Sequence, residues 1–376
     1  MKNGADLRYF SAPGRVEVGG NHTDHQRGRV LASAINLEAS AAVTPNGTNV
    51  VRMKNAVYGS DEIDLSDLKF KSEEIGTPAS LVRGVAAWFV ENGYAIGGFD
   101  AEISSNIPLG AGLSSSAAIE VLIGNIFKGL FGADISRIEI AQAGQYAENI
   151  YFGKPCGLMD QAASSFGGLN LIDFHDPDKP IVTSVLAEFP GYSLCVVNTG
   201  GSHADLTPDY AACTREMKLI AKHFGKEFLR DVSEDEFFSS LASMRRLGDR
   251  ALLRAIHFFG DNKRVLLQVD ALEKGDMDTF LELVIESGRS SFAYLQNSYS
   301  PNNPQEQGLT LALALSERIL AGCGAWRLHG GGFAGTILAF VPHDKKDVYR
   351  DKLSAVFGDG CCHFLEVNKH GGGTVL

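Results

Sequence analysis

The chain has 376 residues, of which 44% are hydrophobic, and a formal net charge of −11. A chain of this length and apolar content is expected to form two domains with sizeable cores. The acidic balance excludes the broad basic surface that nucleic-acid partners require, but it is compatible with a local site for phosphate and Mg²⁺.

Cysteine usage and hydropathy favour a cytoplasmic protein. The six cysteines include no C-x-x-C pair, and a disulfide framework is not expected at this length, so we expect reduced thiols. The N-terminus lacks the apolar segment of a secretory signal. No run of about 18 apolar residues occurs, which predicts that no segment crosses a membrane.

The first segment rich in polar groups is residues 14–25, Gly-Arg-Val-Glu-Val-Gly-Gly-Asn-His-Thr-Asp-His. It brings a guanidinium, a carboxamide, an imidazole and a carboxylate close together in the chain. Such groups can bind several sugar hydroxyls, because each hydroxyl both donates and accepts a hydrogen bond. His22, Asp24 and His25 also suggest a metal site, although adjacent ligands in so short a loop give poor geometry. A polar surface loop is the third interpretation.

A strand predicted over residues 99–107 leads into a glycine-rich turn at residues 108–118, Pro-Leu-Gly-Ala-Gly-Leu-Ser-Ser-Ser-Ala-Ala. Apolar residues at helical spacing follow, and Gly132 is a suitable end for that helix. A glycine-rich turn that opens a helix presents free N–H groups to a phosphate, which points to a nucleotide. The turn lacks the lysine of a P-loop and the third glycine of a dinucleotide fingerprint. By itself it also fits an ordinary strand-to-helix connection.

Two acidic residues flank the next turn. A capping box at residues 136–139 predicts a second helix that ends at Gly153. Glu148 lies near the end of this helix, and Asp160 follows the segment Gly-Lys-Pro-Cys-Gly-Leu-Met. One carboxylate could hold Mg²⁺ while the other faces an attacking hydroxyl. Taken separately, they also fit a solvated helix face and a helix N-cap.

The remaining elements alternate without strict βαβ repetition, which predicts an α+β fold. A polar, proline-containing stretch at 176–180 indicates a division into domains 1–175 and 176–376. Four glycines in the segment 330–335 exceed what a hairpin needs, so we expect another group to pass close to this backbone, with the neighbouring His329 structural. Strands are predicted at 169–174, 194–198, 325–329, 336–341 and 363–367, and helices over 208–321 and 344–357.

Together these segments resemble the galactokinase branch of the galactokinase, homoserine, mevalonate and phosphomevalonate kinase superfamily. Residues 108–118 are similar to its second motif, 328–335 to its third and 15–31 to the galactokinase signature, with 157–161 and the terminal 371–376 also matching. The resemblance implies a two-domain small-molecule kinase fold with its active site in the interdomain cleft. It also implies ATP and Mg²⁺ as cofactors and phosphorylation of the C1 hydroxyl of galactose, to give galactose 1-phosphate and ADP. We expect a monomer.

The resemblance also implies roles for individual residues. Asp160 matches the catalytic aspartate beside the sugar hydroxyl, and Arg15 matches its cationic neighbour. Ser116 and Glu148 match the Mg²⁺ ligands. The sugar-contacting positions are Asn21, His22, Asp24, Gly157 and Tyr210, and the backbone that wraps the ATP phosphates comprises Gly110, Ala111, Gly112, Leu113, Ser114, Ser115 and Ser116.

The signature departs from the family pattern at three positions: Glu17 replaces an asparagine, Asn21 a glutamate and His25 a tyrosine. The family's glutamate is associated with the C6 hydroxyl of the sugar. An amide can still accept from that hydroxyl but carries no charge, so a C6-carboxylate sugar such as galacturonate is the alternative substrate, with Arg27 and Arg29 as possible anion partners.

A non-enzymatic galactose sensor is a more distant alternative. Such sensors lack part of the Ser-Ala run of the second motif, whereas residues 114–118 are intact here. An oxidoreductase is disfavoured because the turn lacks the third glycine and has the wrong strand–helix context.

Overall fold

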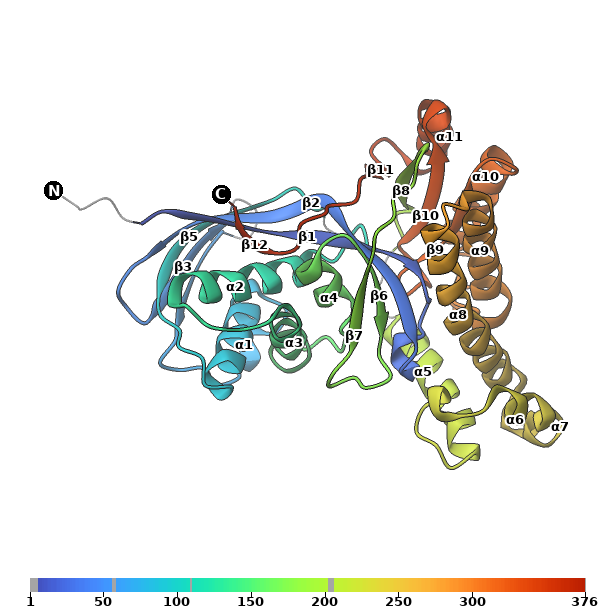
Figure 1. Cartoon of the computed structure of the whole chain (residues 1–376), viewed down its shortest axis with the longest axis horizontal. Coiled ribbons are helices and arrows are strands. Elements are labelled where there is room, and N and C mark those ends of the chain that lie inside the picture. The colour runs from blue at the N-terminus through green and yellow to red at the C-terminus, as the bar shows by residue number, and fades with distance from the viewer. Residues whose placement is uncertain (1–5, 56–58, 109, 202–205, 376) are drawn as a thin grey trace.

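The computed structural model describes residues 6–55, 59–108, 110–201 and 206–375. Leu109 of the glycine-rich turn and Leu376 of the terminal segment lie outside the described residues. Helices and strands are intermixed along the chain (Figure 1), which confirms the α+β class. Within the described ranges no helix is both long enough and apolar enough to cross a bilayer.

The larger sheet has eight strands, and its main path runs β12-β1-β2-β5-β3-β4, with β6 beside β2 and β7 beside β6. β1 and β2 are antiparallel, with register shifts between Pro13 and Arg15 and between Glu17 and Gly19. Because bulges bend a strand and redirect its side chains, these shifts help to set the directions of Arg15 and Glu17. The strands are β1 (Arg8–Gly19), β2 (Arg29–Pro45), β3 (Val50–Asn55), β4 (Gly59–Asp64), β5 (Phe99–Ser105), β6 (Leu169–Asp173), β7 (Ile181–Val185) and β12 (Gly373–Val375).

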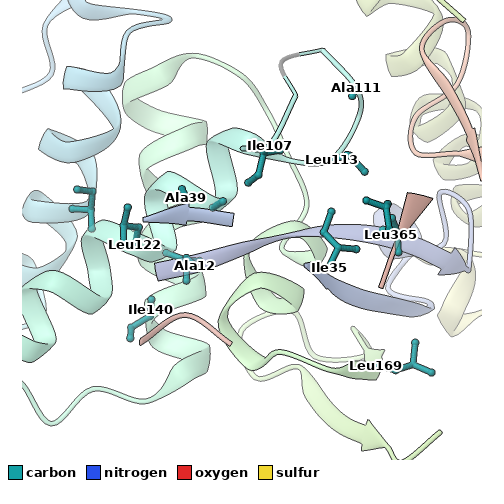
Figure 2. Packing of buried hydrophobic residues seen from close by; sticks show 14 of the residues in the cluster. Ala12, Ile35, Ala39, Ile107, Ala111, Leu113, Leu122, Ile140, Leu169 and Leu365 are labelled. Atoms are coloured by element: carbon teal, nitrogen blue, oxygen red, sulfur yellow. The ribbon is translucent and has the colours of Figure 1, made fainter. Parts of the chain in front are cut away.

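Four helices lie on one side of this sheet (Figure 1). Leu122 of the second helix and Ile140 of the third share one buried cluster with Ala12 and Ala39 of the sheet (Figure 2). The second helix is apolar almost all round, which suits an element packed between a sheet and other helices. These helices are α1 (Pro78–Glu91), α2 (Ser115–Phe131), α3 (Arg137–Tyr146) and α4 (Met159–Phe166).

The predicted helix boundaries are confirmed here. Gly132 ends α2 in the left-handed conformation with φ 71°. Ser136 and Glu139 form both bonds of the capping box at the start of α3. α3 continues into a π-helical segment, Ala147–Phe152, which Gly153 ends with φ 81°. A π-helical segment widens the helix locally, and this one contains Glu148.

The second sheet has four strands in the order β11-β8-β10-β9 and includes the predicted strands around the third glycine-rich motif. The expected helix-rich region lies between β8 and β9, and the last helix follows β10. The strands are β8 (Tyr192–Asn198), β9 (Ala325–His329), β10 (Thr336–Pro342) and β11 (Cys362–Leu365); the helices are α5 (Thr207–His223), α6 (Glu234–Ser239), α7 (Leu241–Met244), α8 (Asp249–Glu273), α9 (Met277–Ser290), α10 (Gly308–Leu320) and α11 (Lys346–Phe357).

Two strands from the predicted second domain, 176–376, belong to the first sheet. β7 pairs with β6, and the short strand β12, which the sequence pattern did not reveal, pairs with β1. Both strands lie in the second range of the predicted division into domains 1–175 and 176–376, but they pair with strands of the first range. The division remains a prediction.

The C-terminal segment also contacts α4. The Gly372 N–H donates to the Ser164 carbonyl oxygen at 3.0 Å, and a Cβ at Gly371 would clash with backbone atoms of Ser165 and Phe166. At Gly373 the nearest atom would be 4.0 Å away. The end of the chain is thus packed against the end of α4 through backbone alone.

We predict that Gly371→Ala lowers the free energy of unfolding by about 2 kcal/mol, because the clashing atoms are backbone and cannot move aside cheaply. Gly373→Ala is the matched control and is expected to change it by less than about 0.5 kcal/mol. Denaturant unfolding of the two variants measures the difference. Equal stabilities would show that this packing does not contribute.

Candidate active site

The first cluster joins Arg15 of β1 to Asp160 at the start of α4. Arg15 donates two parallel hydrogen bonds to the carboxylate, from Nε to Oδ1 at 2.7 Å and from Nη2 to Oδ2 at 2.6 Å. Its Nη1 donates to the Gly112 carbonyl oxygen at 2.6 Å, and the Ser114 hydroxyl donates to Asp160 Oδ2. Because a forked guanidinium–carboxylate pair fixes both side chains, β1, the glycine-rich turn and α4 are held together at this point.

The Asp160 carboxyl is held in its ionised form. Burial acts to raise its pKa, but the charge of Arg15 and the hydrogen bonds from Arg15 and Ser114 bring the pKa below its usual value. The Asp160 side chain is 25% exposed, against 8% for Arg15, so the accessible side of the pair is the carboxylate. Such a group accepts a hydrogen bond from a hydroxyl readily but is a weak base.

The glycine-rich turn presents backbone at its surface. Gly110 and Gly112 have φ values of 71° and 67°, which favour glycine. The side chains of Ala111 and Leu113 point into the buried core (Figure 2). Ser114 provides no side-chain cap for α2, so the first N–H groups of α2 are left for a ligand at the positive end of the helix.

The second cluster surrounds Glu148. Its Oε1 accepts from the Ser116 hydroxyl at 2.9 Å and from the Lys154 ammonium at 3.1 Å. Its Oε2 accepts from Gln161 Nε2 at 2.9 Å. Because Gln161 directly follows Asp160 at the start of α4, one helix end contacts both acidic clusters.

A further buried acid belongs to this cluster, and the sequence reasoning missed it. Gln161 Nε2 also donates to Glu120 Oε2 at 2.9 Å, and Glu120 is fully buried on α2. Burial and the charge of Glu148 raise the pKa of Glu120 well above its usual value, so the group favours its protonated form. Its i+4 spacing from Ser116 was the available signal, because that spacing places both residues on one face of α2.

Ser116 and Glu148 form a donor set that suits Mg²⁺, because a hydroxyl and a carboxylate are hard oxygen ligands. Lys154 already places a cation beside Glu148 Oε1. The described part of the chain contains no cluster of three or more His, Cys, Asp or Glu side chains that is arranged to bind a metal ion. This fits Mg²⁺, which usually takes one or two carboxylates together with substrate phosphates and water.

The predicted sugar-contacting residues come together around Tyr210. His25 Nε2 lies 2.8 Å from the Tyr210 hydroxyl, and the His22 and Tyr210 ring centroids are 5.0 Å apart. A Cβ at Gly157 would clash with an Asp24 carboxylate oxygen, so Gly157 and Asp24 are in contact. Burial lowers the pKa of His22 to about 3, which keeps its ring neutral. The metal interpretation of His22, Asp24 and His25 has no support, since these residues make no metal-binding group.

The third glycine-rich motif closes the site from the second sheet. A Cβ at Gly331 would lie 2.7 Å from the Tyr210 ring, and one at Gly112 would lie 2.7 Å from Thr336 Oγ1. The close approach at Gly331 accounts for one of the four glycines of this motif, and the other three, Gly330, Gly332 and Gly335, have positive φ values that favour glycine. His329 is buried, accepts from the Glu17 N–H at 3.0 Å and lies 3.1 Å from Thr336 Oγ1, which confirms a structural histidine.

Asn21 has no hydrogen-bonding position left for a sugar. It is fully buried; its Nδ2 donates to Glu17 Oε1 and the Gly330 carbonyl oxygen, and its Oδ1 accepts from Ser291 and Asn297. An amide has two donors and two acceptor lone pairs, so the protein satisfies all four. Its assignment as a sugar contact stays a prediction that this arrangement does not favour.

The two arginines proposed as anion partners are engaged elsewhere. Arg29 pairs with Asp173 at 2.7 Å. The Arg27 guanidinium carbon lies 4.2 Å from the Phe228 ring centroid, a cation–π contact. Neither arrangement supports recognition of a sugar carboxylate.

Phosphoryl transfer to an alcohol requires amides and cations that hold phosphate, next to an acid that orients the hydroxyl. The start of α2, Arg15, Asp160 and Glu148 bring groups of these types close together, an arrangement that fits a small-molecule kinase. Residues 80–168 match the N-terminal domain of GHMP kinases, and residues 2–45 match the galactokinase galactose-binding signature.

Similarity to individual proteins shows which family of small-molecule kinases this is. The chain is 34% identical to galactokinase of Glaesserella parasuis over 91% of this chain and 87% of that protein, and 34% identical to galactokinase of Haemophilus influenzae over 90% and 86%. The structure of Lactococcus lactis galactokinase complexed with galactose superposes with a TM-score of 0.85 at 26% identity, covering 98% of this chain and 95% of that one. A mevalonate kinase shares the fold at a TM-score of 0.67 and 16% identity, over 96% and 99%. The chain belongs to the galactokinase family.

We predict that Gly157→Ala raises the KM for the sugar about tenfold, because the new methyl group displaces the Asp24 carboxylate. The KM for the nucleotide should stay unchanged. Gly260→Ala on α8, where the nearest atom would be 3.8 Å away, is the matched control and should change neither value. An unchanged sugar KM in Gly157→Ala would remove the Gly157–Asp24 contact from sugar binding. Steady-state kinetics with each substrate varied in turn decides.

The lowered pKa of Asp160 also predicts a pH effect on stability. The folded protein favours the ionised form, so the pair with Arg15 stabilises above the unfolded pKa, and this contribution is lost as the pH falls through the folded pKa. Asp160→Asn should therefore lower the free energy of unfolding by about 2 kcal/mol at pH 7. The difference from the wild type should shrink below about pH 4. Denaturant unfolding at several pH values tests this, and a constant difference would contradict it.

Proposed function

We propose that this protein transfers the γ-phosphoryl group of ATP to the C1 hydroxyl of galactose, giving galactose 1-phosphate and ADP. The observation that carries the proposal is the forked Arg15–Asp160 pair, bonded to Gly112 and Ser114 of the glycine-rich turn. This pair supports the proposal because it brings an acid that can accept from a hydroxyl close to a backbone that can bind phosphate. The relatives named galactokinase support the choice of galactose.

In the proposed reaction, the backbone of residues 110–116 binds the phosphates at the start of α2. Asp160 orients the C1 hydroxyl and accepts its proton late, because an acid with a lowered pKa cannot deprotonate a sugar hydroxyl early. Arg15 holds Asp160 and supplies positive charge close to the transferred group. Positioning and charge neutralisation account for most of the catalysis in a loose transition state.

Ser116 and Glu148 would hold Mg²⁺, which neutralises phosphate charge when it is bound. Gln161 fixes Glu148 through its Oε2 and thereby leaves Oε1 directed at Ser116 and Lys154. His22, Asp24, Gly157 and Tyr210 would surround the sugar.

Galacturonate is the less favoured substrate, since Arg27 and Arg29 bind other groups and the site contains several carboxylates. The sensor alternative is disfavoured because the Ser-Ala run and both acids are present. We also propose a cytoplasmic monomer, in keeping with the acidic charge and six free cysteines.

An assay of sugar-dependent ADP release with galactose, galacturonate, N-acetylgalactosamine and glucose tests the proposal. We expect kcat/KM for galactose to exceed that for galacturonate at least about 100-fold, as a buried like-charge contact costs several kcal/mol. Equal or higher activity with galacturonate would overturn the choice of sugar. Galactose binding without any ADP release would favour the sensor.

Asp160→Asn tests the catalytic role. We predict that kcat falls at least about 100-fold, because the amide neither accepts the proton nor orients the hydroxyl in the same way. Sugar affinity, measured separately by calorimetry, should fall much less. Undiminished turnover would remove Asp160 from the mechanism.

A further inference from the structure

Glu17 places a carboxylate in the sugar segment where the family pattern has an asparagine. Its side chain is 5% exposed, and its Oε1 accepts from Arg327 Nη2 at 2.6 Å and from Asn21 Nδ2 at 3.0 Å. Arg327 is fully buried and also donates to the carbonyl oxygens of Val18 and Leu328. Glu17 is therefore fixed firmly through one oxygen.

Asn21, which donates this hydrogen bond to Glu17, occupies the position at which the family pattern has a glutamate. Positions 17 and 21 thus contain the same two chemical groups as the family signature, in exchanged order, and the two side chains are bonded to each other. Asn21 is saturated by protein groups, so it offers nothing to a ligand. The carboxylate of the pair is the group that retains an acceptor.

Glu17 Oε2 accepts no hydrogen bond from any residue within the described ranges. Burial raises the pKa of Glu17 to about 7, the charge of Arg327 lowers it, and the charges of Asp24 and Arg15, which belong to the sugar region, also act on it. Burial, followed by charges that include those of Asp24, Asp160 and Glu17, raises the pKa of Tyr210 well above its usual value. The printed contacts lead from Glu17 to this region in two steps: Asn21 Nδ2 donates to both Glu17 Oε1 and the Gly330 carbonyl oxygen, and a Cβ at the next residue, Gly331, would lie 2.7 Å from the Tyr210 ring.

Resting on the proposed function, we propose that Glu17 is a specificity-determining residue whose Oε2 accepts a hydrogen bond from the C6 hydroxyl of galactose. Asn21 is a positioning residue that holds Glu17 and the backbone of the third motif. The exchange of glutamate and asparagine between positions 17 and 21 moves the carboxylate by four residues along the chain, and the two side chains stay hydrogen-bonded to each other.

The exchange also reverses the conclusion that Asn21 alone suggested. Replacing glutamate by asparagine at position 21 removes a charge that would repel a C6 carboxylate. Glu17 restores that charge, because its carboxylate is bonded directly to Asn21. A neutral hydroxyl can donate to Glu17 Oε2, whereas a uronate would place a second carboxylate beside it.

The test measures the coupling between Glu17 and individual sugar hydroxyls. Calorimetry without nucleotide gives the Kd of the wild type and of Glu17→Gln for galactose and its 2-, 3-, 4- and 6-deoxy analogues. We expect Glu17→Gln to weaken galactose binding at least about tenfold, because a hydrogen bond to a charged acceptor is lost. The 6-deoxy analogue, which cannot make that bond, should bind both proteins equally.

A loss of the same factor for every sugar, or coupling to another hydroxyl, would overturn the assignment to C6. Asp261→Asn is the matched control: Asp261 is also buried and accepts from Asn21, but from its backbone N–H at 2.8 Å, and its ionic partner is Arg264. It should show no coupling to any hydroxyl. If the wild type binds no galactose, the proposed function fails as well; if it binds galactose without coupling, only the role of Glu17 fails.

Glu17→Gln leaves the buried Arg327 without its ionic partner and could unfold the protein. Glu17→Asp keeps the charge near Arg327 but shortens the side chain, and it should lose the same coupling.

A second test restores the residue order of the family signature at positions 17 and 21. Asn21→Glu alone sets two carboxylates together and should weaken galactose binding. The double variant E17N/N21E should bind galactose at least about tenfold more tightly than Asn21→Glu. A double variant no better than Asn21→Glu would contradict the exchange.

Discussion

The forked pair of Arg15 and Asp160 is the interaction on which the site depends. It connects the first strand, the glycine-rich turn and the start of α4, which are far apart in the sequence. Removing one member would leave the other largely buried and without its ionic partner, which is far more costly than the pair itself is stabilising. Arg15 therefore fixes the position of the glycine-rich turn relative to the Asp160 carboxylate, so neither can shift without the other.

Helix α4 transmits this constraint because it is short and held at both ends. At its start, Asp160 bonds to Arg15 while Gln161 bonds to Glu148 and Glu120. At its other end, the C-terminal segment packs backbone against backbone at Gly371. A helix of eight residues has little stability of its own. Its position, and with it the distance between the two acidic clusters, is determined by these tertiary contacts.

Local chemistry made much of this structure predictable. Gly132, Gly153 and the Ser136–Glu139 capping box end or begin helices for reasons that lie within a few residues. Glu120 and Asn21 could not be assigned in the same way. Glu120 lies in an apolar helix, where its i+4 spacing from Ser116 is only a weak signal, and its significance depends on Gln161 from another helix. The amide of Asn21 is satisfied by Ser291 and Asn297, more than 250 residues away, and no spacing rule anticipates such a contact.

The balance of charge in the site fits the proposed pair of substrates. Asp24, Asp160 and Glu148 oppose Arg15 and Lys154; Glu17, whose pKa burial raises to about 7, is paired with Arg327, and Glu120 favours its neutral form. A neutral polyol meets an excess of acceptors there and can donate to them. A nucleotide phosphate that approached Ser116 would instead meet the Glu148 carboxylate, a repulsion that Lys154, 64% exposed on its flexible stem, offsets only in part. Mg²⁺ held by Ser116 and Glu148 would offset that repulsion, so the same acid that would exclude bare nucleotide would favour its magnesium complex.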